Sequence, residues 1–186
     1  TRQDGRAVLE ELRGVRVWDP SLDAVMIDLS VSLVAGYGGV IFGDTKEAGM
    51  ACVRVAASME VEEGGRLENP SGGVNEAEVW GRRAPWCDYS GEVEGERLGI
   101  AIFDHPSNPR HPTYWHARDY GLMTANCFGI SVFGKDPSIS GRLFLDDGQD
   151  LTFNYRIYVH RGDAKQGSVA AVYERFASSP VWRVKR

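Results

Sequence analysis

The sequence predicts a mostly β fold, an antiparallel β-sandwich with one C-terminal helix. Alternation of apolar and polar residues with a period of two recurs along the chain. Segments rich in Gly, Pro and Asn separate these runs, and only one long segment has a helical period. The 186 residues are 42% hydrophobic and 25% charged, which is typical of a globular chain. We expect a single domain over residues 1–186, with a closed barrel as the alternative.

The clearest strand pattern lies in 25–33. Its odd positions are apolar, whereas Asp28, Ser30 and Ser32 occupy even positions. Such alternation predicts a half-buried strand with one polar face. Further elements are predicted in order: a short strand at 39–42, a turn at 43–47, a strand at 50–59, and a loop at 64–73.

Two β-hairpins are predicted in the second half of the chain. The first joins strands 86–93 and 97–104, and the second joins 143–146 and 150–159 through Asp147-Gly148, a pair typical of tight turns.

Only two segments have a helical pattern. One is a short turn at 7–12. The other is a helix over 167–178, in which Val169, Val172, Tyr173 and Phe176 have the spacing i, i+3, i+4, i+7. That spacing gives a helix one apolar face.

Composition and motifs exclude several classes of protein. The net charge of −5 argues against a nucleic-acid partner, because such proteins usually carry a basic face. Apolar runs fall far short of the roughly 18 residues that a membrane-spanning helix needs. The three cysteines, Cys52, Cys87 and Cys127, form no CxxC pair, so we expect isolated thiols. The chain has no P-loop, no GxSxG and no GxGxxG after a strand, which excludes nucleotide-cofactor and serine-hydrolase sites.

Polar and aromatic residues concentrate in segment 103–121. It holds His105, His111 and His116, three of the four histidines of the chain. Its three prolines restrict the backbone and disfavour a helix or a central strand. A rigid polar loop that leaves the end of a strand is a common location for a binding or catalytic site.

The predicted catalytic groups come from this segment. His105 or His116 would act as a general base, because histidine titrates near neutral pH. Asp104 and Asp119 would either form a carboxylate pair for sugar chemistry or orient His105 and Arg118. Two alternatives stay open for the histidines: capping of backbone groups, and metal ligation. Their spacing matches no metal motif, and a strand would place His111 and His116 on opposite faces.

The predicted substrate-binding groups combine aromatic rings with hydrogen-bonding side chains, a mixture that suits sugars. Arg110 and Arg118 would clamp an oxyanion or a hydroxyl, and Trp86 and Trp115 would be stacking surfaces. Trp80 and Trp86 could instead seal a core edge, and Lys46 with Glu47 could be a solvated salt bridge. The full set is Asn108, Arg110, His111, Trp115, Tyr120, Trp86, Asp88, Arg54 and Lys46.

Segments 43–47, 80–91 and 102–121 resemble the PmoA-like family, bacterial domains of unknown function labelled "methane oxygenase PmoA". The resemblance runs from about residue 22 to the C-terminal helix. It implies a β-sandwich similar to galactose-mutarotase folds, and a role in carbohydrate metabolism, since family members often accompany sugar-processing genes. Family members usually carry an upstream half with a His-His-His-Gly motif, which is absent here. We therefore expect this chain to lack the N-terminal part of the family domain.

The leading hypothesis is a carbohydrate-active or sugar-binding protein whose partner is a small saccharide. It would perform acid/base chemistry as a hydrolase, lyase or epimerase, in the bacterial cytoplasm or periplasm. The hypothesis needs no cofactor, although a divalent metal is an alternative. The first alternative function is a metal-dependent oxidoreductase, as the family label implies. The second is a non-catalytic sugar-binding or interaction module.

Overall fold

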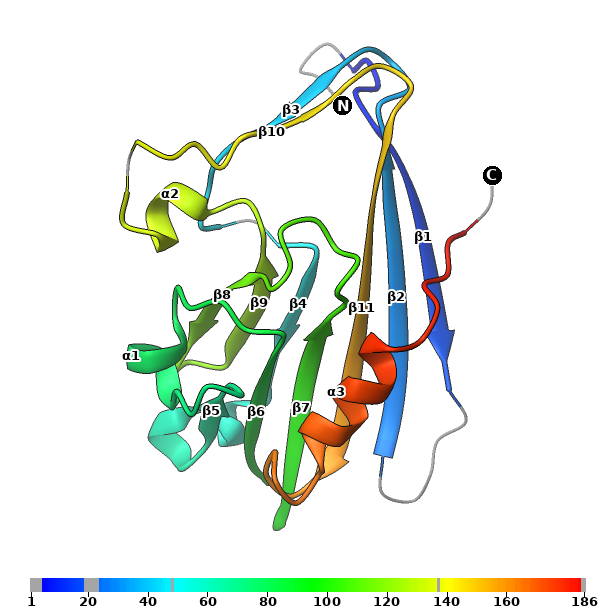
Figure 1. The fold of residues 1–186 in the computed structure, drawn as a ribbon. Coiled ribbons are helices and arrows are strands. Elements are labelled where there is room, and N and C mark those ends of the chain that lie inside the picture. Colours follow the sequence, from blue (N-terminus) through cyan, green and yellow to red (C-terminus); the bar gives the residue numbers. More distant parts are fainter. Residues whose placement is uncertain (1–4, 19–23, 48, 137, 185–186) are drawn as a thin grey trace.

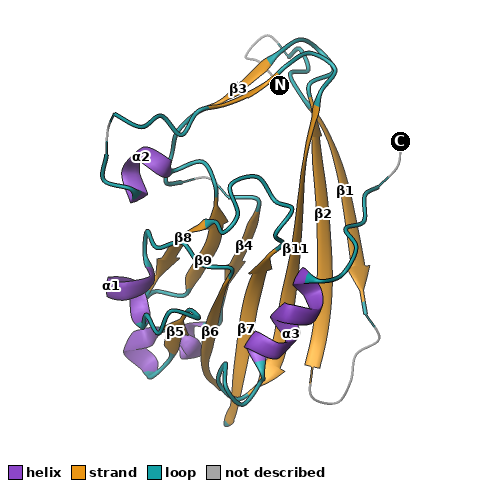
Figure 2. Ribbon diagram, viewed as in Figure 1, coloured by secondary structure: helices purple, strands orange, loops and turns teal. Residues whose placement is uncertain are grey.

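A computed structural model describes residues 5–18, 24–47, 49–136 and 138–184. Within these residues strands dominate, helices are few and short, and the paired strands run antiparallel (Figures 1 and 2). The strands form three sheets, of six, three and two strands. The predicted mostly β class with a C-terminal helix is therefore confirmed.

The largest sheet forms one side of the molecule (Figure 1). The long strand β11 lies at its centre: it pairs with β2 along nearly its whole length and with β7 from Tyr155 to Arg161. Its spatial order is β1 (Glu10–Val17), β2 (Ala24–Val34), β11 (Asp150–Arg161), β7 (Glu96–Asp104), β6 (Trp86–Val93) and β5 (Arg66–Glu68).

Two smaller sheets accompany it. The three-stranded sheet has the order β4 (Ala51–Arg54), β9 (Leu122–Asn126) and β8 (Tyr114–Arg118). The two-stranded sheet pairs β3 (Val40–Phe42) with β10 (Leu143–Leu145), and it runs across the top of the view in Figure 1.

The six-stranded and three-stranded sheets share one hydrophobic core. Because side chains alternate across a strand, each sheet turns one apolar row toward the other. The larger sheet contributes Tyr89, Ile102, Phe153 and Tyr155, and the smaller sheet contributes Ala51, Trp115, Ala117, Met123 and Ala125. The side chains on the opposite face of the three-stranded sheet therefore point away from this core.

The helices lie outside this core. Helix α3 (Val169–Ala177) covers the second face of the six-stranded sheet (Figure 1), where Tyr173 and Phe176 pack on Phe103 and Tyr158. The remaining helical segments are η1 (Ala57–Met59), η2 (Val61–Glu63), α1 (Asn75–Val79) and α2 (Ile130–Phe133).

The segments with the clearest sequence patterns form the elements predicted for them. The strand predicted at 25–33 is β2, and the short strand at 39–42 is β3. The expectation that β2 is only half-buried was wrong, because Asp28, Ser30 and Ser32 on its polar face are buried as well. The first hairpin is confirmed as β6 and β7, which are paired from Trp86 with Phe103 to Val93 with Glu96. The C-terminal helix is α3.

Three elements predicted in the first half of the chain differ in the structure. The helical turn expected at 7–12 is replaced by strand β1, because eight of its residues pair with β2. The strand expected at 50–59 ends at Arg54, and the 3₁₀ turns η1 and η2 follow. The loop expected at 64–73 contains the short strand β5.

The second predicted hairpin was also wrong. Strand β10 pairs with β3, and β11 pairs with β2 and β7. The turn between β10 and β11 is bonded to Ala35, the residue after β2. Gly148 N–H donates to the Ala35 carbonyl, and Ala35 N–H donates to the Gln149 carbonyl. The local turn at Asp147-Gly148 forms as predicted, closed by Gln149 N–H donating to the Asp146 carbonyl at 3.0 Å, but β10 and β11 do not pair with each other across it.

Candidate functional site

The histidine-rich segment 103–121 divides into two parts with different surroundings. Residues from Asp104 to Thr113 fold into a buried polar network. The following residues form strand β8, which pairs with β9. The three prolines all precede β8, which is an edge strand of its sheet, so the expectation that they disfavour a helix or a central strand is not contradicted.

Asp104 is the centre of the buried network. The residue is 1% exposed. Its Oδ1 accepts from the Asn108 amide at 2.7 Å, and its Oδ2 accepts from the Thr113 N–H at 2.9 Å and contacts His111 Nδ1 at 2.8 Å. The Asn108 side chain in turn bridges to the backbone of Asn154 in β11 with two bonds of 2.7 and 2.6 Å. These contacts favour a role for the buried Asp104 and Asn108 in fixing the loop, and they hold the partly exposed His111 ring against it.

Arg110 is also occupied by the protein itself. Its guanidinium donates to the carbonyl oxygens of Cys127 at 2.8 Å, Gly141 at 2.7 Å and Arg142 at 3.0 Å. These bonds tie the segment to the chain that leads from β9 to β10. Three of its five N–H donors are thereby used by backbone carbonyls, which favours a role in fixing the loop over the predicted role as a clamp for substrate hydroxyls.

His105 has protein partners at both ring nitrogens. Its Nδ1 accepts from Ser107 N–H at 3.1 Å, so its Nε2 carries the proton and contacts the Ser179 carbonyl at 3.2 Å. Burial lowers the pKa of His105. The ring borders a cavity of about 150 Å³ whose other walls include Trp18, Phe176 and Trp182. We therefore interpret His105 as a histidine that caps backbone groups.

The two predicted stacking rings are buried. Trp115 is fully buried in the core between the sheets, where its indole N–H donates to the Ala84 carbonyl at 2.9 Å. Trp86 is 7% exposed and packs under α3 with Phe103. The prediction that these rings form a stacking surface was wrong, because alternation along their strands points both into cores.

Asp88 forms a buried pair with the fourth histidine, His160. Asp88 Oδ1 lies 2.8 Å from His160 Nε2, and His160 Nδ1 lies 3.1 Å from the Arg161 carbonyl. Burial opposes the charge on His160, but the Asp88 carboxylate and this carbonyl outweigh it and raise the pKa of His160. Asp88 is completely buried, so it belongs to this pair and not to a substrate-binding surface.

The remaining predicted residues converge on the outer face of the three-stranded sheet. His116 pairs with Thr124, which pairs with Cys52, so these three side chains form one row across β8, β9 and β4. Arg118, Leu122 and Arg54 form the next row. Since Trp115, Ala117 and Met123 occupy the core face, alternation places both rows on the opposite face.

His116 is the unusual member of this face. It is 4% exposed, yet its buried Nδ1 has no hydrogen-bond partner within the described residues. The rings of Trp80 and Phe133 approach it edge-on, with centroids at 6.4 and 6.3 Å. The Trp80 indole nitrogen is also buried without a partner in the described part of the chain. Leaving a buried polar atom unpaired costs about 1–3 kcal/mol, so two such atoms on rings whose centroids lie 6.4 Å apart call for an explanation.

Four charged groups surround His116. Lys46 pairs with Glu47, and Arg118 Nε lies 3.0 Å from a Glu76 carboxylate oxygen. Burial is the main cause that lowers the pKa of His116; the Glu47 charge opposes this effect, and the Lys46 charge adds to it. Pairing with Lys46 lowers the pKa of Glu47. At neutral pH the site therefore presents a neutral imidazole beside an ionised carboxylate.

Tyr120 and Asp119 complete the site at the end of β8. Tyr120 is 43% exposed, and the guanidinium carbons of Arg54 and Arg118 lie 4.9 and 5.4 Å from its ring centre. Asp119 accepts from Glu76 N–H at 2.8 Å, and its own N–H donates to the Glu76 carboxylate at 3.1 Å. Asp119 thus positions Glu76 and does not act as a carboxylate partner of Asp104.

The structure brings together His116, Arg118, Tyr120, Arg54 and Lys46 of the predicted set. Sequence reasoning missed the groups that complete the site: Glu47, Glu76, Trp80 and Phe133. Trp80 was noted only as a stacking or core ring, and Glu47 only as a salt-bridge partner. Glu76 and Phe133 carry no local signal, because α1 and α2 bring them to β8 from distant parts of the sequence.

A cavity of about 230 Å³ lies against the Trp80 and Phe133 rings, and His116 itself is not among its lining residues. The rings of Trp80 and Phe133, which contact His116, form part of its wall. The lining residues are Glu76, Ala77, Trp80, Gly81, Arg82, Phe133 and Lys135. Gly81 is required here, because its φ of +67° favours glycine and a Cβ would stand 3.3 Å from Phe133.

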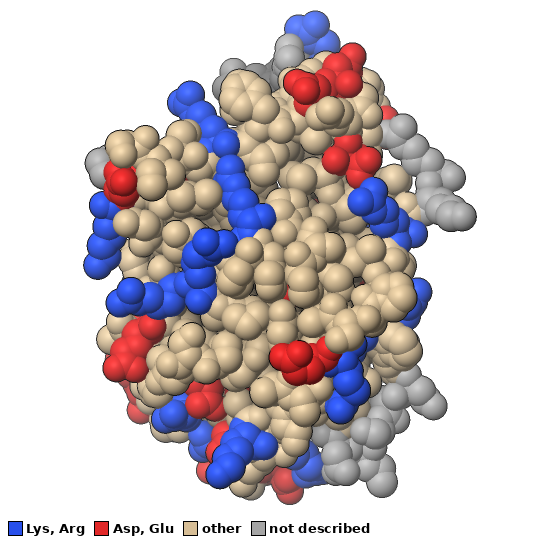
Figure 3. All heavy atoms as spheres, viewed as in Figure 1, with Lys and Arg blue, Asp and Glu red and all other residues tan. Residues whose placement is uncertain are grey.

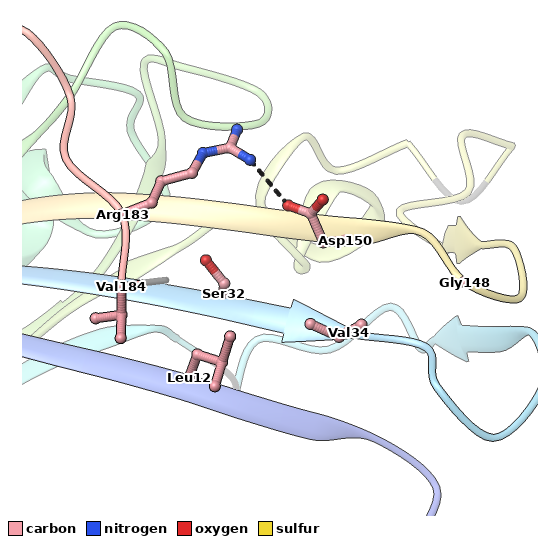
Figure 4. Close-up of a pocket in the computed structure, with 7 residues that line it drawn as sticks. All are labelled: Leu12, Ser32, Val34, Gly148, Asp150, Arg183 and Val184. Atoms are coloured by element: carbon pink, nitrogen blue, oxygen red, sulfur yellow. Dashed lines mark hydrogen bonds and ion pairs between the residues drawn. The ribbon is translucent and has the colours of Figure 1, made fainter. Parts of the chain in front are cut away.

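A second cavity, of about 250 Å³, lies where the C-terminal segment crosses β1 and β2 (Figure 4). Its two charged side chains, Arg183 and Asp150, form an ion pair with each other at 3.1 Å. This mutual neutralisation makes it a weaker candidate than the cavity against Trp80 and Phe133.

Among the described residues, no three His, Cys, Asp or Glu side chains gather closely enough to hold a metal ion. Likewise, no helix in that part of the chain has the length and apolar character needed to cross a membrane.

The fold and this face define a mostly β protein with a polar, histidine-centred site on its smaller antiparallel sheet. The model of a family of unknown function, DUF6807, matches residues 1–174. The chain therefore belongs to the DUF6807 family. No curated protein and no solved structure matches it.

Proposed function

We propose that this protein binds a saccharide at the outer face of the three-stranded sheet and performs acid/base chemistry on it through His116. The observation that carries the proposal is the His116 imidazole, which is buried and unpartnered within the described residues. It lies next to a second unpartnered group, the Trp80 indole nitrogen. Saccharides supply hydroxyl groups that both donate and accept hydrogen bonds, so one ligand can satisfy both atoms.

The charges around His116 favour its action as a general base over its action as a general acid. A lowered pKa keeps the His116 imidazole neutral at neutral pH, and a neutral imidazole can accept a proton from a saccharide. The imidazolium that forms is stabilised by the Glu47 and Glu76 carboxylates, both of which favour the charged ring. Arg118 and Tyr120 then provide hydrogen bonding and an exposed aromatic face, the combination that sugar recognition uses.

The resemblance to the PmoA-like family is in keeping with this proposal. It implies a β-sandwich of the galactose-mutarotase type and a role in carbohydrate metabolism. Two sheets that share one core are what such a sandwich requires. We propose this architecture as the finer description of the fold.

The test compares matched histidine variants. The full chain, His116→Gln and the control His105→Gln are incubated with a panel of neutral and acidic mono- and oligosaccharides, and the sugars are followed by proton NMR. We expect one class of sugar to be converted by the wild type and by H105Q. H116Q should lose at least about 100-fold in rate, the typical contribution of a general base. Thermal unfolding of each variant verifies that it is folded.

Three other results would change or overturn the proposal. Conversion that survives in H116Q would contradict His116 as the base. Saturable binding with no conversion would replace the enzyme with a non-catalytic sugar-binding module. Neither binding nor conversion across the panel would overturn the proposal as a whole.

A further inference from the structure

The cavity against Trp80 and Phe133 carries positive charge that the protein does not neutralise. Its cationic residues are Arg82 and Lys135. Neither side chain forms an ion pair with a carboxylate within the described ranges. The single acidic residue in the lining, Glu76, is already paired with Arg118 at 3.0 Å and accepts from Asp119 N–H at 3.1 Å.

Lys135 occupies its position at a conformational cost. It follows α2 and the cap residue Gly134, and its φ is +55°. Glycine is the usual residue at this left-handed position after a helix, and any other residue costs roughly 1–2 kcal/mol there. This backbone conformation places Lys135 in the lining of the cavity.

One band of the wider surface is rich in positive charge, although Asp and Glu side chains lie elsewhere on the same face. Figure 3 shows a band of Lys and Arg side chains on the face seen in Figure 1. Three arginines are connected by hydrogen bonds. The Arg83 guanidinium donates to the Arg110 carbonyl, and the Arg110 guanidinium donates to the Arg142 carbonyl. This local excess of positive charge stands in contrast to the net charge of −5 for the whole chain.

From these observations we infer that the cavity binds a carboxylate on the saccharide, so that the substrate class is an acidic sugar of the uronic acid kind. The inference rests on the proposed function and specifies its ligand. Arg82 and Lys135 supply the charge that a carboxylate needs. The Trp80 indole N–H supplies an unpartnered donor, and Phe133 supplies an apolar wall. A volume of about 230 Å³ is below the roughly 300–1,000 Å³ of sites for drug-sized ligands, and it suits one sugar ring.

The experiment compares sugars that differ only at one carbon. Galacturonic acid and galactose, and glucuronic acid and glucose, are titrated into the full ¹⁵N-labelled chain. The Trp80 indole N–H signal, assigned with Trp80→Phe, reports binding. The variants are Arg82→Gln with Lys135→Gln, and the matched control Arg175→Gln with Lys165→Gln. The two control residues are exposed and lie on or next to α3, on the far side of the six-stranded sheet.

We expect at least one acid to bind about tenfold more tightly than its neutral parent, the gain of one charge-assisted hydrogen bond. The R82Q/K135Q variant should reduce that preference to less than about threefold and leave the weak affinity for the neutral sugar unchanged. The control pair should retain the full preference. Added salt should weaken binding of the acid and leave binding of the neutral sugar unaffected.

Equal affinity for acid and neutral parent, or a preference that survives in R82Q/K135Q, would overturn the inference and leave the proposed function standing. Galactose 6-sulfate is a further probe: binding tighter than galacturonic acid would show that the cavity selects a sulfate ester and not a carboxylate. If no sugar of either kind shifts the Trp80 signal, while the spectrum is that of a folded chain, the proposed function fails together with this inference.

Discussion

Replacing Asp104 by alanine tests whether this carboxylate is structural or catalytic. The side chain accepts from the Asn108 amide and the Thr113 N–H and contacts the His111 ring, all within 2.9 Å. Loss of the carboxylate leaves the Thr113 N–H buried and unpaired, and the Asn108 amide keeps only its bond to the Asn154 carbonyl. Each buried donor that loses its acceptor costs about 1–3 kcal/mol, whereas His111 is partly exposed and can turn to water.

The sum is a loss of about 4 kcal/mol in the free energy of unfolding. For a domain of this size each kcal/mol lowers Tm by about 2–4 °C, so Tm should fall by roughly 8–16 °C. Urea unfolding and calorimetry measure both quantities. The matched control is Asp146→Ala, since Asp146 is exposed and its carboxylate has no hydrogen bond within the described residues. A D104A protein within 1 kcal/mol of the wild type would refute the structural assignment and return Asp104 to the candidate catalytic groups.

Three further predictions follow from the other histidine environments. Because the pKa of His160 is raised above 6.5 in the folded chain, its stabilisation is complete below that pH. It is lost as the pH rises further, by at most about 1.4 kcal/mol per pH unit; urea unfolding from pH 6 to 9 should show this slope, and His160→Gln should remove it. Gly99→Ala should lower stability by about 1–3 kcal/mol by the same assay, because a methyl group would overlap the His160 ring. In an NMR titration the ring of His116 should titrate below pH 6.5, since burial lowers its pKa; a midpoint above 6.5 would contradict the environment described.

Strands whose pattern depends on burial alone could be predicted from the sequence. In β2, alternation reflects one face on the core, and in α3 the spacing of Val169, Val172, Tyr173 and Phe176 reflects contact with the sheet. Pairing partners could not be predicted. The turn after β10 looks like that of a hairpin, but Gly148 is hydrogen-bonded to Ala35, more than a hundred residues earlier. Such a contact leaves no mark in the local sequence.

The same limit applies to the site. His105, His111 and His116 are equivalent in the sequence, since each lies in the same polar, proline-rich segment. Their roles differ because His105 and His111 meet partners on other elements, Ser179 and Asp104, while His116 meets only the edges of two rings. Composition therefore located the segment, and tertiary contacts decided which of its residues has an unsatisfied side chain.

The central claim is that the buried His116 imidazole is neutral, has no hydrogen bond to another described residue, and is the group that a bound saccharide contacts. The most direct measurement is a long-range ¹H–¹⁵N spectrum of the histidine rings at pH 7, recorded with and without the saccharide panel. We predict a neutral His116 ring whose nitrogen signals shift saturably with at least one sugar, while the His105 signals stay in place. A His116 ring that is protonated at pH 7, or that no sugar in the panel shifts, would contradict the claim.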